Sequence, residues 1–201
     1  MALALNDKVL TEAFGPSEGT SLRVKQAAMV ILGIAALAIF AKIKIPMWPV
    51  PITMGTFAVL TIGAAYGPRL GLATILGYMI VGALGFDVFA SSSAEAYGIS
   101  YMMGGTGGYL VGYVLATLAL GLAARAGCDR SVLLMAVAML AGTALIYVFG
   151  LAWLSVLYAD KGAAWVIGVG LTPFLIGDAL KLGLAALLLP ALWKLIGDAR
   201  S

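Results

Sequence analysis

Apolar residues gather in six long runs along the chain, and short polar connections separate the runs. A helix that crosses the hydrocarbon core of a membrane needs roughly 20 predominantly apolar residues, and somewhat fewer where it is locally bent. Except for a short second run, the runs have about this length, and they cover residues 26–41, 55–66, 70–86, 105–124, 132–157 and 173–196. The pattern therefore predicts an all-α integral membrane protein with six transmembrane helices.

Composition supports this fold class and excludes several kinds of function. Of the 201 residues, 63% are hydrophobic and 10% are charged, and the mean hydropathy is +1.07, whereas about a quarter of the residues of a soluble domain are charged. The chain has no histidine and one cysteine, Cys128, which excludes internal disulfides, histidine metal sites and histidine triads. We expect no catalytic residue, metal or cofactor. The net charge of +3 is scattered over the connections, so it indicates membrane topology and no nucleic-acid surface.

The first 22 residues differ from the rest of the chain because they are polar. They include Asp7, Glu12, Pro16 and Glu18, and they lack the continuous apolar core of a signal peptide. The sequence therefore predicts two parts, a polar cytoplasmic segment over residues 1–22 and a six-helix, membrane-embedded domain that binds a substrate over residues 23–201.

Basic residues in the connections predict the orientation of the helices. Lys and Arg are enriched in cytoplasmic loops. With six crossings, Lys42, Lys44 and Lys161 fall on one side, and the larger group falls on the other: Arg23, Lys25, Arg69, Arg125, Arg130, Lys194 and Arg200. We therefore expect both termini in the cytoplasm and the protein in the bacterial cytoplasmic (inner) membrane, surrounded by lipid.

Asp178 and Lys181 lie inside the last apolar run, three positions apart on one helical face. A charge in the middle of a membrane costs roughly 2.5–3.5 kcal/mol on insertion scales, so such residues have a partner or a function. The predicted topology places both residues in the outer half of the membrane. Two interpretations are open: a structural ion pair, or a pair that binds a ligand with a polar N–H end and an acid end.

The two longer outer connections carry further candidates for a binding site. The first, KIKIPMWPVPITM, has three prolines that keep it extended, and it forms either a lid over an outward pocket or an interfacial loop anchored by Trp48. The second, FDVFASSSAEAYGISYMMGGTGGY, ends in a glycine-rich run. That run lacks the strand and the lysine of a phosphate loop, so its glycines at positions 104, 108 and 112 indicate close helix packing. Thr106 and Tyr109 are placed to direct polar atoms at a ligand.

Three segments resemble one known family, in the same order and over roughly residues 25–195. They are PVPITMGTFAVLTIGAAYGPRLGLATILGYMIVGALGFDVFA, MGGTGGYLVGYVLA and PFLIGDALKLGLAALLLP. Together they resemble BioY, the biotin-specific substrate-binding subunit (S component) of energy-coupling factor (ECF) transporters. The resemblance implies a six-helix membrane protein whose pocket opens toward the outside and captures biotin there. It also implies a transmembrane coupling subunit and ATP-binding-cassette ATPases as partners, although the family includes members without them.

The resemblance also implies which residues bind biotin. The terminal Asp and Lys of the family fall on Asp178 and Lys181, and Gly55 stands where members commonly have Gln. Biotin has ureido N–H groups, an apolar bicycle and chain, and a carboxylate. We expect Asp178 to accept a ureido N–H, and Lys181 either to pair with the carboxylate or to hold Asp178. The further polar candidates are Thr53, Ser91, Ser92 and Tyr147, and the apolar candidates are Trp48, Phe89 and Trp153.

Three alternatives remain at this stage. An S component for another vitamin and a solitary biotin carrier without the ECF module both fit the same residues. A membrane hydrolase or lipid transferase is disfavoured, because the chain has no histidine and no second carboxylate deep within an apolar run.

Overall fold

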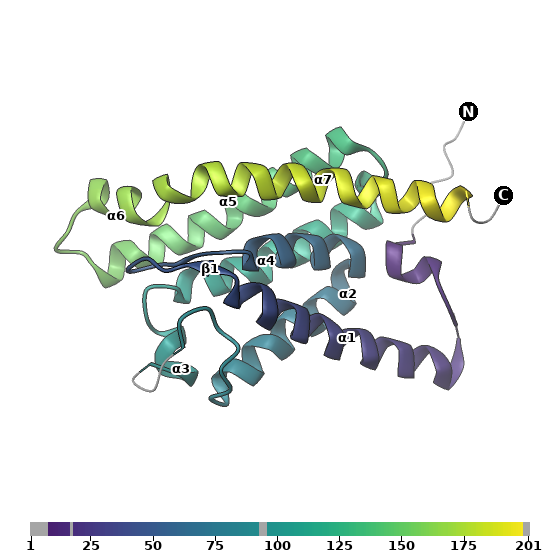
Figure 1. Ribbon diagram of the computed structural model, residues 1–201, viewed down its shortest axis with the longest axis horizontal. Helices are drawn as coiled ribbons and strands as arrows, with labels where there is room; N and C mark the ends of the chain where they lie inside the picture. Colours follow the sequence, from purple (N-terminus) through teal and green to yellow (C-terminus); the bar gives the residue numbers. More distant parts are fainter. Residues whose placement is uncertain (1–7, 17, 93–95, 199–201) are drawn as a thin grey trace.

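A computed structural model describes residues 8–16, 18–92 and 96–198, and almost all of its regular structure is helical (Figure 1). The long helices are α1 (Gly19–Lys42), α2 (Gly55–Ala83), α4 (Gly107–Arg125), α5 (Val132–Leu157) and α7 (Leu175–Asp198). The short elements are η1 (Leu10–Ala13), β1 (Lys44–Ile45), β2 (Ile52–Thr53), α3 (Gly98–Met102), η2 (Cys128–Arg130), α6 (Ala163–Gly170) and η3 (Thr172–Phe174).

The prediction of an all-α membrane protein is confirmed. Among the described residues, five segments are long and apolar enough to cross a membrane, namely α1, α2, α4, α5 and the continuous stretch Ala163–Ile196. This last stretch joins α6, η3 and α7, so the final apolar segment begins earlier than the predicted residue 173. Pro173 lies in η3, the turn that precedes α7.

α2 contains two of the six predicted helices. Gly67 interrupts it with φ 75° and ψ 178°, a conformation that favours glycine, and Pro68 follows. A Cβ atom on Gly71 would lie 3.6 Å from the Cα atom of Gly63, eight residues earlier. This short distance shows that the chain folds back there. The predicted runs 55–66 and 70–86 are therefore the two arms of α2, which brings the number of long helical segments to six.

The core lies where α2, α4 and α5 pack together. Small residues permit this packing, as predicted for the glycine stripe of α4. A Cβ atom on Gly112 would lie 2.6 Å from the Cα atom of Ile146, and one on Gly108 would lie 2.3 Å from the carbonyl oxygen of Phe149. By contrast, only 17% of the most apolar 18-residue stretch of α1 is buried within the protein. Its exposed side chains, among them Ile31 and Leu32, form a surface suited to lipid.

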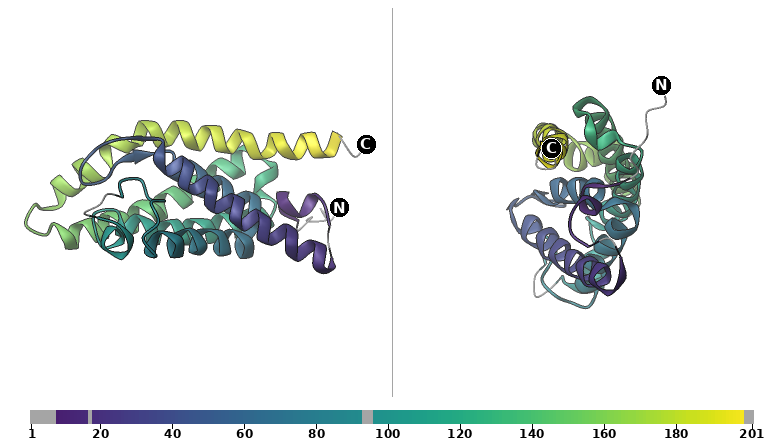
Figure 2. Two further views of the ribbon diagram at one scale, coloured as in Figure 1. Left: turned by 60° about the horizontal axis from the view of Figure 1, so that its bottom comes forward. Right: turned by 90° about the vertical axis from the view of Figure 1, so that its right-hand side faces the viewer.

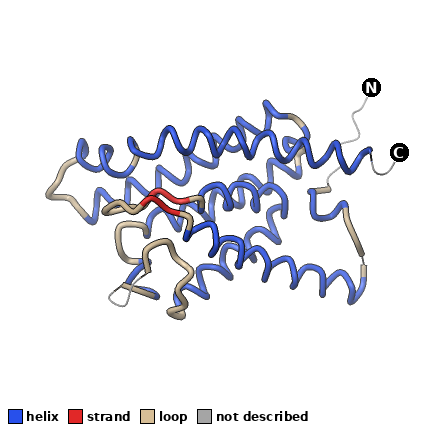
Figure 3. The backbone as a smooth tube through the Cα atoms, in the orientation of Figure 1, coloured by secondary structure: helices blue, strands red, loops and turns tan. Residues whose placement is uncertain are grey.

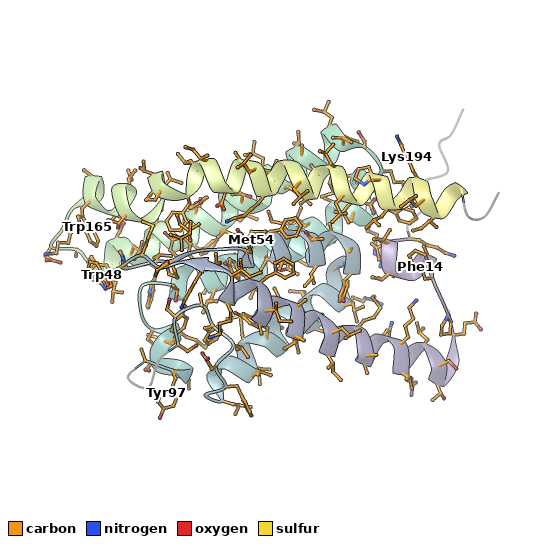
Figure 4. The ribbon with its side chains drawn as sticks, viewed as in Figure 1. Phe14, Trp48, Met54, Tyr97, Trp165 and Lys194 are labelled. Carbon is orange, nitrogen blue, oxygen red and sulfur yellow. The ribbon has the colours of Figure 1, made fainter. Side chains whose placement is uncertain are left out.

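The two ends of the molecule differ. At one end, which we call the hairpin end, β1 and β2 form a short antiparallel hairpin with Lys44 opposite Thr53 and Ile45 opposite Ile52 (Figure 3). α3 and the α5–α6 connection lie at the same end (Figure 1). Trp48 contacts Trp165 there, with ring centroids 5.9 Å apart (Figure 4). The predicted extended connection is thus a hairpin that reaches the α5–α6 region.

The other end, the terminal end, holds η1, η2 and the last turns of α7 (Figure 2). Lys194 marks it in Figure 4. Arg125 closes α4, and its guanidinium pairs with the carboxylate of Glu12, with N and O 2.7 Å apart. This contact fastens the segment before α1 to the end of α4. Lys42, Lys44 and Lys161 lie at the hairpin end, so the described members of the two predicted groups of basic residues lie at opposite ends. Arg200 of the larger group lies outside the described residues.

Candidate binding site

A cavity lies toward the hairpin end, between β2, α2, α3, α4, α5 and α7. The walls combine apolar surface with polar side chains, and their residues come from segments far apart in the sequence. The wall residues include Thr53, Thr56, Tyr78, Phe89, Tyr101, Thr106, Tyr109, Tyr113, Tyr147, Phe174, Asp178 and Lys181. The cavity therefore has the lining of a site for a small molecule that is partly apolar and partly polar.

Asp178 and Lys181 form an ion pair on one face of α7, as their spacing predicted. The Lys181 ammonium lies 2.7 Å from Oδ1 of Asp178. The two residues are only 7% and 8% exposed. A pair as buried as this is stable only where further hydrogen bonds satisfy its remaining donors and acceptors.

Lys181 uses its whole donor capacity within the protein. An ammonium group has three N–H donors, and three acceptors surround this one. They are Oδ1 of Asp178 at 2.7 Å, the carbonyl oxygen of Thr53 at 2.6 Å and the hydroxyl oxygen of Thr56 at 3.2 Å. Lys181 therefore connects α7 with β2 and with the first turn of α2.

Asp178 accepts hydrogen bonds from two further side chains. The Thr56 hydroxyl donates to Oδ1 over 3.3 Å, and the Tyr147 hydroxyl of α5 donates a short hydrogen bond to Oδ2. A carboxylate has about four lone-pair sites, so the donors from Lys181, Thr56 and Tyr147 leave capacity for one more. The carboxylate faces the cavity with an unused acceptor position, and it is suited to receive an N–H group.

Aromatic rings form much of the remaining wall. Tyr147 packs edge-on between Tyr109 and Phe174, with ring centroids 6.3 Å and 6.4 Å apart. On another part of the wall, Phe89 stacks on Tyr101 with centroids 4.9 Å apart. The Tyr109 hydroxyl donates to the carbonyl oxygen of Gly170 over 2.7 Å. These contacts hold flat apolar faces around the charged pair.

Seven of the eleven predicted site residues line this cavity, and four lie elsewhere. Those in the wall are Thr53, Phe89, Thr106, Tyr109, Tyr147, Asp178 and Lys181. The described cavity wall does not include Trp48, Ser91, Ser92 or Trp153.

Local contacts explain where these four side chains lie. Trp48 is 68% exposed at the hairpin. Trp153 donates from Nε1 to the carbonyl oxygen of Gly104 over 2.8 Å, in the connection between α3 and α4. Ser92 donates to the carbonyl oxygen of Phe89 over 3.1 Å, and Ser91 is exposed.

Sequence reasoning missed several wall residues, among them Thr56, Tyr113 and Phe174. Tyr113 had a usable signal, because it lies four positions after Tyr109 and so on the same face of α4. Phe174 precedes Asp178 by four positions and had the same signal. For Thr56 the spacing gave no signal, because its contact with Asp178 spans 122 residues of sequence.

The chain is similar to a known protein family over most of its length. The family model described as the BioY family matches residues 15–198. The probable biotin transporter BioY of Pyrococcus horikoshii is 33% identical over 167 residues, which are 83% of this chain and 95% of that protein. The biotin transporter BioY of Thermotoga maritima is 34% identical over 161 residues, which are 80% of this chain and 91% of that protein.

The fold is similar to that of a solved structure as well. The crystal structure of the S-component for biotin from an ECF-type ABC transporter aligns with a TM-score of 0.75 at 20% sequence identity. The alignment covers 89% of this chain and 95% of the other. At this identity the likeness shows that the two chains share a fold.

Proposed function

Because the chain belongs to the BioY family, we propose that it transports biotin, which it binds in the cavity between β2 and α7. It is a multi-pass protein of the cytoplasmic membrane and not an enzyme, as its relatives and its apolar helices indicate. The observation that carries the proposal is the buried carboxylate of Asp178, which faces a partly aromatic cavity with acceptor capacity unused.

The chemistry of the cavity supports biotin as the ligand. Its ureido ring offers two N–H donors, and the open acceptor position of Asp178 is suited to one of them. The bicycle is apolar and flat enough to pack against rings such as Tyr147 and Phe174. Lys181 has no donor left over, so its role is to neutralise and orient Asp178. These contacts support one of the two roles that the sequence left open for Lys181, that of holding Asp178.

We propose that the hairpin end faces the outside and that both termini are cytoplasmic. The described members of the larger group of basic residues lie at the terminal end, and Lys and Arg are enriched on the cytoplasmic side of membrane proteins. In this orientation the cavity lies in the outer half of the membrane. An imported solute would meet the site there first.

For the energy source, we propose the module of an ECF transporter, with a transmembrane coupling subunit and ATP-binding-cassette ATPases. The shared fold with an S component supports this proposal. The competing hypothesis is a solitary carrier. Uptake of labelled biotin should be measured in a host that lacks the coupling subunit. Uptake by the chain alone would overturn the ECF proposal while leaving biotin transport intact.

The binding proposal is tested by equilibrium binding of biotin to the purified protein. Replacing Asp178 with Asn should weaken binding by about 1.5–3 kcal/mol, the range for a hydrogen bond to a charged group. The matched control is Asp160→Asn at the exposed Asp160–Lys161 pair, which should leave the affinity unchanged. Unchanged affinity in Asp178→Asn would contradict the assignment of Asp178. Competition by riboflavin or thiamine against labelled biotin would instead indicate another vitamin.

A further inference from the structure

A ligand with an acid end needs a cation near the cavity, and the described residues offer few. The described chain has four arginines, and all belong to elements of the terminal end. They lie at positions 23, 69, 125 and 130. Three lysines touch the cavity or the segments that line it. These are Lys181 inside it, and Lys42 and Lys44 beside the hairpin. Their existing contacts decide which of them can receive a carboxylate.

Two of the three ammonium groups are already matched by carboxylates. Lys181 pairs with Asp178 and directs its other donors to Thr53 and Thr56. Lys42 pairs with Asp87 in a short contact. The hydrogen bond from Lys42 is the largest cause that holds the pKa of the Asp87 carboxyl below its usual range, and a hydrogen bond from Ser92 and the charge of Lys44 act in the same direction. Neither lysine adds net positive charge to the cavity.

Lys44 is in a different position. Its ammonium donates a short hydrogen bond to the carbonyl oxygen of Ala90, and Ala90 is a wall residue of the cavity. Its backbone lies in β1 directly opposite Thr53, which is also a wall residue. Within the described residues this bond to a neutral carbonyl uses one of three N–H donors. Among the described residues Lys44 forms no ion pair, and it acts with Lys42 on the single carboxylate of Asp87. Two lysines facing one carboxylate leave one positive charge at the edge of the cavity.

We infer that Lys44 is the residue that recognises the carboxylate end of the ligand, while Asp178 receives the opposite, N–H-bearing end. The inference rests on the proposed function, because it needs a ligand with an acid at one end. It assigns the two ends of the ligand to two charges of opposite sign, one buried in α7 and one exposed on β1. An exposed lysine at this place would also attract an anionic ligand before it enters.

The test compares two ligands that differ only in the charge of the tail, biotin and biotinamide, on four purified proteins. Wild-type protein should bind biotin about threefold to tenfold more tightly than biotinamide, as expected for a partly exposed charge pair. Lys44→Gln should reduce this ratio to about one and leave the affinity for biotinamide unchanged. Lys44→Arg should keep the ratio, because it keeps the charge. Lys161→Gln, which removes the same charge from a lysine paired with Asp160, should keep it as well.

A second measurement needs no variant. The wild-type preference for biotin over biotinamide should fall as the ionic strength rises from roughly 50 mM to roughly 500 mM, since an exposed pair is screened by salt. A Lys44→Gln protein that keeps the wild-type ratio would overturn the inference, and so would a wild-type protein that does not distinguish the two ligands. In both cases biotin binding, and with it the proposed function, would stand. A wild-type protein that binds neither compound would overturn the proposed function and this inference together.

Discussion

The side chain of Lys181 donates a hydrogen bond to the backbone carbonyl oxygen of Thr53 over 2.6 Å, across 128 residues of sequence. Lys181 is buried in α7, and Thr53 ends the β1–β2 hairpin. The same ammonium pairs with Asp178. One side chain thus neutralises the buried carboxylate and fixes the hairpin against the helix that carries it. A ligand bound to Asp178 would therefore lie next to the ammonium group of Lys181, which holds the hairpin in place.

Replacing Lys181 with Met should destabilise the protein strongly. Removal of one partner of a buried ion pair typically costs about 3–5 kcal/mol, because the other charge stays buried without compensation. Here the loss would also free the carbonyl of Thr53. Thermal unfolding in detergent should show the decrease, with Lys161→Met as the exposed control, which should unfold within a degree or two of wild type.

The double variant Asp178→Asn with Lys181→Met separates charge from packing. It leaves no buried charge unpaired, so it should be more stable than Lys181→Met alone, although neither charge remains. The two substitutions should therefore be non-additive, as expected for residues in contact. A double variant whose loss equals the sum of the two single losses would show that the pair does not act as a unit.

Much of the fold could be predicted from where apolar residues gather, because a membrane allows few structures other than helices. The two runs on either side of Gly67 and Pro68 predicted two arms, and the structure joins them in α2. The start of the last segment was predicted too late. Helical structure begins at Ala163 in α6, which precedes η3 and α7. Helix propensity is weak evidence where tertiary packing supports the backbone.

Residues of the site could be predicted from the sequence only where placing the side chain in the membrane costs free energy. Asp178 and Lys181 stood out because charges are expensive in an apolar helix. Their partners Thr53 and Thr56 come from more than 120 positions away, and only the folded chain brings them together. Ser91 and Ser92 were predicted as polar partners of the ligand. Their hydroxyl groups had no such cost, and they do not line the described cavity.

Replacing Tyr147 with Phe should weaken biotin binding by about 1 kcal/mol, the usual net worth of a hydrogen bond. The Tyr147 hydroxyl donates to Oδ2 of Asp178, so we infer that it orients the carboxylate toward the ligand. The ring stays in place in this variant, and the apolar wall is preserved. Tyr158→Phe is the matched control, because Tyr158 packs against Trp48 and Trp165 away from the described cavity wall.

The effect of Tyr147→Phe should depend on Asp178. In an Asp178→Asn background the same change should cost much less, because Tyr147 acts through that carboxylate. Equal losses in both backgrounds would indicate that Tyr147 contributes to the wall alone.

At the terminal end, a buried carboxylate connects η2 with α7. Asp129 is fully buried, and its Oδ2 accepts a hydrogen bond from Nε1 of Trp193 over 2.5 Å. The guanidinium of Arg130 lies 4.5 Å from the centre of the Trp193 ring. Burial raises the pKa of the Asp129 carboxyl, whose Oδ1 has no hydrogen-bond partner among the described residues.

The raised pKa of Asp129 and its contact with Trp193 lead to opposite expectations for two substitutions. Asp129→Ala leaves the Trp193 N–H buried without an acceptor, which should cost about 1–3 kcal/mol of unfolding free energy. Asp129→Asn keeps an acceptor and removes the desolvated charge, so its stability at pH 7 should equal or exceed that of wild type.

In the wild type, the folded state holds a proton on Asp129 at pH values where the unfolded state has released it. The contribution of Asp129 to stability should therefore fall as pH rises from its ordinary pKa through the raised one. Thermal unfolding between about pH 4 and 7 should show this loss in wild type and not in Asp129→Asn, and parallel curves for the two proteins would contradict it.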